Sequence, residues 1–224
     1  MKKVYLIGTG HSPREDITDD MRAHFSPDLE VHELGALDEF SVDEIKTDFA
    51  PVPGKTTLVA RFRSKEMLAF DEEKAMPYVQ KAFDRANDEG ADLIIVLCTS
   101  KFPPLKSRVP VLFPDKLLHM IAPAIASGMK VAYLFPFASH AEGMAQGWAD
   151  VGLPGNYTCY HPASGDPMSN AIDFLREEDP EFIIMDCIGD SIDLGKKIME
   201  ETGKPALHPR MLLINMAHTL LGIC

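Results

Sequence analysis

Four continuous apolar runs, each followed by a turn, constrain the fold of this chain more than any other feature. The runs are "VYLIG", "LIIVL", "VAYLF" and "FIIM". An apolar run without polar alternation is typical of a strand that is buried on both faces, as in a parallel sheet covered by helices. Because strands alternate with helical patterns along the whole chain, the sequence predicts an α/β fold with mostly parallel sheets.

The chain also contains a faint internal repeat. "VYLIGTGHSPRED" and "VAYLFPFASHAEG" share the order strand, small or polar turn and helix start, and "DLIIVLCTS" resembles "EFIIMDCIG" in the same way. Each half is therefore predicted to be a small α/β unit. The first unit comprises residues 1–108 together with a C-terminal segment, 209–224, and carries an inserted hairpin at about 55–70; the second comprises residues 109–208.

Two of the apolar runs end on a cysteine, Cys98 in the first half and Cys187 in the second. In an open parallel sheet, ligands bind at the carboxyl ends of the strands, where both cysteines are expected. If the two halves face each other, both thiols line one cleft. A thiol that only packs in the core is the competing interpretation, and the matching positions in the repeat favour a functional pair. Cys159, inside a strand, is interpreted as a packing residue.

A pair of thiols suggests proton transfer on two faces of one carbon atom. Removing a proton beside a carboxylate or carbonyl and returning it on the other face needs two bases, one a thiolate and the other a thiol. The two sulfurs then need to lie about 7 Å apart in a closed state. Cys187 precedes a helix predicted to begin near Asp190, whose N-terminus favours a thiolate. Thr99 and Ser100, after Cys98, could hold a carboxylate.

The turn "GTGHSPR" is a second candidate for ligand binding. It is not a dinucleotide-binding loop, because Pro13 stands where the last glycine of that motif belongs, and it lacks the lysine of a P-loop. Ser12 is predicted to cap a helix in which Pro13 takes the first position and Glu15 completes a capping box. An anion could bind at this helix start, with Arg14 or the nearby amides as donors; a plain capped helix is the alternative.

Composition excludes several classes of function. The 224 residues carry a formal net charge of -12, which argues against nucleic-acid binding and against docking on anionic membranes. No apolar segment approaches the length of a membrane span. Four cysteines without a signal-peptide pattern are typical of a reduced cytoplasmic protein. No CxxC or HExxH spacing indicates a metal site, so neither a metal nor an organic cofactor is expected.

Five segments together resemble the AroM family of the aspartate/glutamate racemase superfamily: "GTGHSPREDI", "ELGALDEFS", "LCTSKFP", "FPDKLLHMI" and "MDCIGD". The resemblance runs from the first strand to the last helix. It implies two three-layer α/β units related by a pseudo-twofold axis, and cofactor-independent chemistry with one cysteine per unit, matching Cys98 and Cys187. The superfamily often has Asn-Thr after the first cysteine, where this chain has Thr99-Ser100, and a Thr after the second, where it has Ile188. These departures count against an amino-acid substrate.

The leading hypothesis is a cofactor-independent racemase or epimerase that uses Cys98 and Cys187 as acid and base on a small carboxylate. The predicted substrate-binding residues are Thr9, His11, Ser12, Arg14, Thr99, Ser100, Phe137, Ser139 and Gly189. Two alternatives stay open. One cysteine could act alone in cis-trans isomerisation or decarboxylation of a small acid, or the protein could be a regulatory protein that binds a small acid without turnover. A homodimer is one of the assemblies left open. His140 and His161 are further acid or base candidates, each weighed against an ordinary exposed turn histidine.

Overall fold

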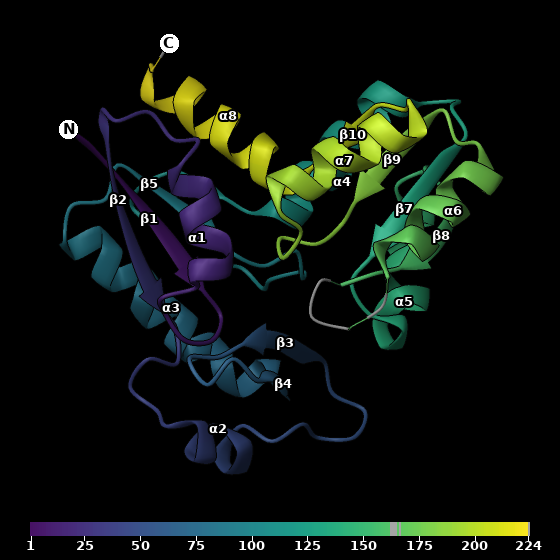
Figure 1. Ribbon diagram of the computed structural model, residues 1–224. Coiled ribbons are helices and arrows are strands. Elements are labelled where there is room, and N and C mark those ends of the chain that lie inside the picture. The colour runs from purple at the N-terminus through teal and green to yellow at the C-terminus, as the bar shows by residue number, and fades with distance from the viewer. Residues whose placement is uncertain (162–164, 166, 224) are drawn as a thin grey trace. The chain divides into compact units, whose positions relative to one another are not determined.

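The computed structural model describes residues 1–161, 165 and 167–223, and the chain divides into two compact units (Figure 1). Unit 1 is formed by Met1–Phe113 and Ile214–Cys224, and unit 2 by Pro114–Leu213. Each unit has its own parallel sheet. Among the described residues, no helix is long and apolar enough to cross a membrane.

The sheet of unit 1 has four parallel strands in the order β2-β1-β5-β6. Their bounds are Lys2–Gly8 for β1, Leu29–Gly35 for β2, Leu93–Val96 for β5 and Val111–Leu112 for β6. All four residues of β5 are buried, as the unbroken apolar run predicts. The short β6 lies inside the proline-rich segment "KFPPLKSRVPVLFPDK", whose composition predicts one long loop. Two residues of this segment instead form a strand, and they pair with Ile94 and Ile95 of β5.

The main core of unit 1 lies between this sheet and a long helix. The helices of the unit are α1 (Glu15–Arg22), α2 (Val42–Asp48) and α3 (Glu72–Asp88). Helix α3 packs on β1 and β2 (Figure 1), and its buried stripe meets Tyr5 and Val96 from the sheet. Pro77 lies inside α3 and not at its start. The helix begins at Glu72, where the side chain of the N-cap residue Asp71 accepts the Lys74 amide.

The predicted hairpin is present in unit 1 as β3 (Thr57–Arg61) and β4 (Met67–Asp71), which pair antiparallel. Helix α2, which precedes the hairpin, was not predicted. Its start was readable, because Ser41 and Glu44 form a capping box in which each side chain bonds the backbone N–H of the other residue.

The sheet of unit 2 also has four parallel strands, in the order β10-β9-β7-β8. Their bounds are Val131–Phe135 for β7, Asn156–Cys159 for β8, Phe182–Met185 for β9 and Ala206–Leu207 for β10. The helices are α4 (Pro114–Ala126), α5 (Ala138–Asp150), α6 (Met168–Glu178) and α7 (Ile192–Thr202), and α8 (Pro209–Leu221) begins in unit 2 and ends in unit 1.

Helices cover both faces of the second sheet, so unit 2 has three layers. Side chains at alternate positions of a strand point to opposite faces. Tyr133 and Ile184 accordingly belong to a cluster with Trp148 of α5, whereas Leu134 and Ile183 belong to a cluster with buried residues of α6 and α7. Burial on both faces explains why these strands are apolar throughout.

Both sheets have the same topology. Numbered by their order within each unit, the strands of both sheets run 2-1-3-4. The repeat detected in the sequence is therefore a repeat of strand connections, and the prediction of an α/β fold with parallel sheets is confirmed.

Candidate functional site

The strand order identifies the part of each sheet where a ligand is expected. In an open α/β sheet the site lies at the carboxyl ends of the strands, where the connections reverse direction, which for the order 2-1-3-4 is between the first and third strands. These are β1 and β5 in unit 1, and β7 and β9 in unit 2. The eleven predicted site residues all follow one of these four strands.

Cys98 lies just after β5, two residues beyond Val96. Its side chain is half-buried and packs against the core of unit 1. The Ser100 amide donates a hydrogen bond to the Cys98 Sγ at 3.5 Å. Irregular backbone without a helix then leads to β6, so the turn that carries Thr99 and Ser100 is not closed by a helix N-terminus.

Cys187 occupies the matching place after β9 and is 7% exposed. The Gly189 amide donates to the Cys187 Sγ at 3.2 Å. Helix α7 begins shortly afterwards at Ile192, and the Ser191 side chain caps it by accepting the Leu194 amide at 3.1 Å. Both cysteines thus accept the backbone N–H of the second residue after them, and such a bond favours a thiolate over a thiol.

Gly189 leaves room beside the Cys187 thiol. A Cβ at this position would lie 3.1 Å from the His161 Nε2 and 3.2 Å from the Cys187 Sγ. The same geometry places the His161 ring next to the turn. That ring also stacks on Phe137, with ring centroids 5.0 Å apart. The ends of β7, β8 and β9 therefore bring Phe137, His161 and Cys187 to one edge of unit 2.

Three polar residues that the sequence interpretation missed are buried next to the Cys187 turn. Asp190 and Arg210 are 0% exposed and His208 is 5% exposed. Arg210 donates to the backbone oxygens of Ile188 and Gly189 at 2.8 Å and 2.9 Å. A readable signal existed, because an arginine beside the apolar run "MLLINMA" needs buried acceptors.

Burial raises the pKa of Asp190 from 3.8 to about 8, although the charge of Arg210 opposes this and that of Asp186 adds to it. Neither carboxyl oxygen of Asp190 has a hydrogen-bond partner within the described part of the chain. The Nε2 of His208 lies 3.1 Å from the Asp190 backbone oxygen, so this nitrogen carries the proton and donates it.

A second buried carboxyl group, Asp186, ties the end of β9 to α5. The Trp148 Nε1 donates to its Oδ2 at 2.9 Å, and His119 stacks on the Trp148 ring at 4.1 Å between centroids. Burial raises the pKa of Asp186 to about 6, while the Trp148 bond and His119 lower it and Asp115 raises it. Asp186 therefore anchors the strand that carries Cys187.

The structure corrects the prediction for Ser12. Helix α1 begins at Glu15, its N-cap is Arg14, and no side chain caps it. The prediction that Ser12 caps this helix with Pro13 in the first position is therefore wrong. The physical reason is a stronger acceptor nearby, because a carboxylate binds the Ser12 donors and holds the turn away from helical geometry.

That carboxylate belongs to Asp38, which gathers the donors of the first turn. It accepts the Ser12 amide at 2.8 Å and the Ser12 hydroxyl, the Gly35 amide at 2.9 Å, and the Arg63 Nη2 at 2.6 Å. A Cβ at Gly35 would lie 2.6 Å from the Asp38 Oδ1, so the close approach needs a glycine. A substrate carboxylate would reach the Ser12 donors only by displacing Asp38.

The other predicted residues of the first turn are also placed. Thr9 and His11 are each 3% exposed. The His11 Nε2 donates to the Phe40 carbonyl at 2.8 Å, and burial lowers the pKa of this histidine. The Arg14 side chain forms two bonds to Asp16, each at 2.9 Å. Arg14 is therefore held by a neighbouring acid of its own helix.

In unit 2, Ser139 is exposed in the first turn of α5, and its hydroxyl lies 3.3 Å from the His140 Nδ1. Phe137 is the N-cap residue of α5, which has no side-chain cap.

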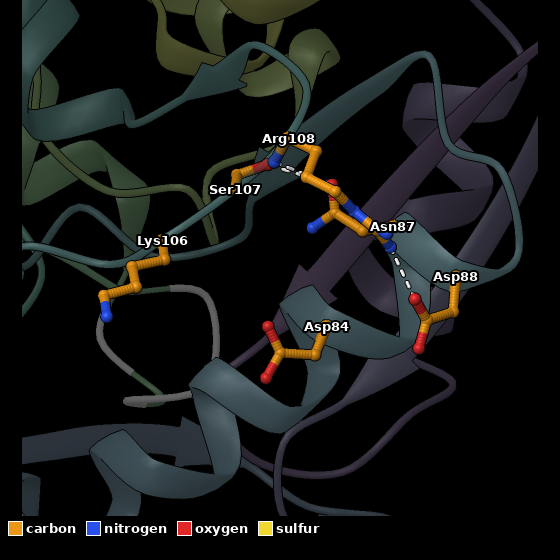
Figure 2. Close-up of a pocket in the computed structure, with 6 residues that line it drawn as sticks. All are labelled: Asp84, Asn87, Asp88, Lys106, Ser107 and Arg108. Carbon is orange, nitrogen blue, oxygen red and sulfur yellow. Dashed lines mark hydrogen bonds and ion pairs between the residues drawn. The ribbon is translucent and has the colours of Figure 1, made fainter.

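A shallow pocket of about 340 Å³ lies elsewhere in unit 1, between the end of α3 and the segment before β6 (Figure 2). It is lined by Asp84, Asn87, Asp88, Lys106, Ser107 and Arg108. None of these six was predicted as a site residue. Arg108 is ion-paired with Asp88, and its amide donates to the Asn87 side chain, so much of the polarity of this pocket is satisfied internally. Within the residues that the structure describes, no group of three or more His, Cys, Asp or Glu could hold a metal ion.

Two parallel sheets of one topology, each with a cysteine after its third strand, place the chain in the fold class of the aspartate/glutamate racemases. The fold is similar to that of three solved structures. Allantoin racemase from Pseudomonas fluorescens is 16% identical, with a TM-score of 0.62 over 99% of this chain and 92% of the other. Maleate isomerase from Pseudomonas putida is 14% identical, with a TM-score of 0.66 over 99% and 93%. Arylmalonate decarboxylase is 13% identical, with a TM-score of 0.59 over 95% and 90%.

The family itself follows from the sequence. The model of the AroM protein family matches residues 4–221, so the chain belongs to the AroM family, as its motifs indicated. No curated protein matches the chain. At these identities the solved structures show a shared fold.

Proposed function

We propose that this protein is a cofactor-independent racemase or epimerase that uses Cys98 and Cys187 as acid and base on a small carboxylate. One observation carries the proposal: the two thiols follow the third strands of two sheets with the same topology, and each sulfur accepts the backbone N–H of the residue two positions after its cysteine. The fold relatives include an allantoin racemase and a maleate isomerase. Chemistry that depends on reduced thiols suits the cytoplasm.

The proposed reaction moves one proton and no net electrons. One cysteine, as a thiolate, removes the proton from the carbon beside the carboxylate and becomes a thiol. The other cysteine, as a thiol, delivers a proton to the opposite face of that carbon and becomes a thiolate. The two residues exchange protonation states in each turnover, and the reverse reaction uses them in the opposite roles. Thr99 and Ser100 remain the proposed donors to the substrate carboxylate in unit 1.

The test is exchange of the carbon-bound hydrogen in deuterated water. Chiral small carboxylic acids and their cyclic amides are incubated with the protein, and loss of the proton signal is followed by NMR together with optical rotation. We expect Cys98→Ala and Cys187→Ala each to lower the racemisation rate by about 10²–10⁴-fold, because each removes the base from one face. Cys159→Ala is the matched control and should keep the rate. Full activity in both single variants would refute the two-base mechanism.

A reaction with one cysteine is the second candidate, and the unequal surroundings of the two thiols favour it. Cys187 is buried in a turn bonded to Arg210, whereas Cys98 is half-buried before irregular backbone. Cis-trans isomerisation or decarboxylation of a small acid would then depend on one thiol and tolerate alanine at the other. Tight binding of an acid without exchange or any other turnover would instead indicate a protein that only binds its ligand.

A further inference from the structure

Arg210 is a fully buried cation that donates hydrogen bonds to the turn that carries Cys187. Its Nε donates to the Ile188 oxygen at 2.8 Å and its Nη2 to the Gly189 oxygen at 2.9 Å, and the residue is 0% exposed. Burying a guanidinium is costly unless its donors are bonded. Two carbonyl oxygens in succession match the forked geometry of arginine, which a lysine cannot reproduce.

One peptide group connects this cation with the thiol. The Ile188 C=O and the Gly189 N–H are the two ends of the same planar peptide unit. Arg210 bonds the oxygen end at 2.8 Å, and the nitrogen end donates to the Cys187 Sγ at 3.2 Å. Hydrogen bonds in such a chain polarise one another in a low-dielectric interior. A cation on the carbonyl therefore strengthens the N–H as a donor to sulfur.

We infer that Arg210 is a positioning residue for Cys187: it holds the Ile188–Gly189 peptide with its N–H aimed at the sulfur and thereby favours the thiolate. The inference deepens the proposed function, since Cys187 is one of the two proposed bases. Arg210 acts through the peptide and need not touch the substrate. It also explains why a charged residue stands at the start of a mainly apolar helix.

Other titratable groups face the same turn, and they define what a pH profile of the thiol reports. Asp186 and Asp190 flank the turn in sequence, and both are buried acids. His161 lies beside Gly189, and His208 bonds the Asp190 backbone oxygen. Negative charge on either acid opposes a thiolate. Arg210 is the permanently charged cation bonded to the turn, so its removal should weaken the thiolate most.

The experiment measures how fast iodoacetamide alkylates Cys187 at different pH values in the full-length protein. Timed labelling is followed by peptide mapping, and each rate is divided by its plateau at alkaline pH, which removes differences in access. The variants are Arg210→Met, without the charge, and Arg210→Lys, with the charge but without the fork. Arg176→Met is the control, because Arg176 is a half-exposed arginine of the same unit. Cys98 and Cys159 serve as internal references in every sample.

For Arg210→Met we expect the normalised labelling of Cys187 at neutral pH to fall by about tenfold, the effect of one lost charge-assisted contact. The normalised labelling rate of Cys187 in Arg210→Lys should lie between those of Arg210→Met and the parent protein. The pH profiles of Cys98 and Cys159 should be unchanged. Loss of local structure alone would instead raise the absolute labelling rates of Cys187 and Cys159 at every pH and leave the normalised rate of Cys187 unchanged. That result, or an unchanged Cys187 profile in a folded variant, would overturn the inference.

If Arg210→Met does not fold, the lysine variant decides, since an unchanged profile there also contradicts the inference. The outcome is separate from that of the proposed function, because labelling needs no substrate. If the Arg210 variants shift the labelling profile but Cys187→Ala racemises at the full rate, Arg210 positions the turn and the thiol is not catalytic. If the Arg210 variants leave the profile unchanged but Cys187→Ala loses racemisation, the thiol is catalytic and Arg210 does not act on it.

Discussion

The Cys98 turn and the Cys187 turn end the third strands of their sheets in the same way, but different structures follow them. In both turns, the amide of the residue two positions after the cysteine donates to the sulfur, at 3.5 Å for Cys98 and 3.2 Å for Cys187. Cys98 is followed by irregular backbone, and Cys187 by a capped helix and a peptide bonded to Arg210. The comparison indicates that strand topology sets the common contact, whereas the residues that support each turn differ. We expect this difference to set the reactivity of each thiol.

The largest expected effect comes from filling the space beside the Cys187 sulfur. In Gly189→Ala, the new Cβ would lie 3.1 Å from the His161 Nε2 and 3.2 Å from the Cys187 Sγ, so the thiol or the ring must shift. We expect the proposed reaction to slow by about 100-fold, because the added methyl group displaces the thiol or the ring by a few tenths of an ångström and also takes up space beside the sulfur that a substrate would need. Rates of hydrogen exchange measure the effect. Gly143→Ala in α5, where a Cβ meets no neighbour, is the control and should keep the rate.

A second prediction concerns the buried acid beside the Cys187 turn. Burial raises the pKa of Asp190 from 3.8 to about 8, so the folded state holds a proton that the unfolded state releases between these values. The stability contribution of the protonated group is complete below about pH 4 and is lost as the pH rises to about 8. For Asp190→Asn, the free energy of unfolding is compared with that of the parent protein at each pH. We expect this difference to be about 1–3 kcal/mol more favourable to the variant at pH 8 than at pH 5.

Urea unfolding at several pH values tests this prediction. Asp193→Asn is the matched control, because Asp193 lies in the first turn of α7 with 87% of its side chain exposed. Its pH profile should follow that of the parent protein. A decline in stability from pH 5 to pH 8 that persists unchanged in Asp190→Asn would show that this carboxyl group is ionised in the folded protein.

A smaller effect should separate the two thiols in the unmodified protein. Because Cys187 has the closer amide and a helix start behind it, its alkylation at neutral pH, relative to its alkaline plateau, should exceed that of Cys98. A helix N-terminus of ordinary strength corresponds to about a two- to fivefold difference. Timed alkylation with peptide mapping measures both thiols in one sample. Faster normalised labelling of Cys98 would reverse the comparison.

The smallest effect is expected at the first turn of unit 1. Arg63 bonds Asp38 at 2.6 Å, but its side chain is 49% exposed. Since exposed ion pairs contribute little, Arg63→Gln should lower the free energy of unfolding by about 0.2–1 kcal/mol. Thermal unfolding at low and high salt measures the effect. Arg176→Gln, which removes the exposed ion pair between Arg176 and Glu201, is the comparison variant. A loss well above this range would mean that Asp38 depends on Arg63 to hold Ser12.

Local patterns in the sequence were sufficient to predict most of the architecture. The unbroken apolar runs identified the central strands, because burial on both faces requires an apolar residue at every position of a strand. The positions of Cys98 and Cys187 at strand ends followed from the same pattern. The capping box of α2 was equally local and was overlooked. The short strand β6 was harder to predict, since two residues carry no period.

By itself, the sequence determined the α/β class, the parallel sheets and the cysteine at the end of each third strand, because these depend on neighbours along the chain. Only the tertiary structure decided which polar groups meet. Ser12 binds Asp38, 26 residues away, instead of capping α1, and Arg210 reaches Ile188, 22 residues away, to hold the Cys187 turn. Such contacts leave no period in the sequence, and burial makes them decisive, because a polar group removed from water must find a partner wherever the fold brings one.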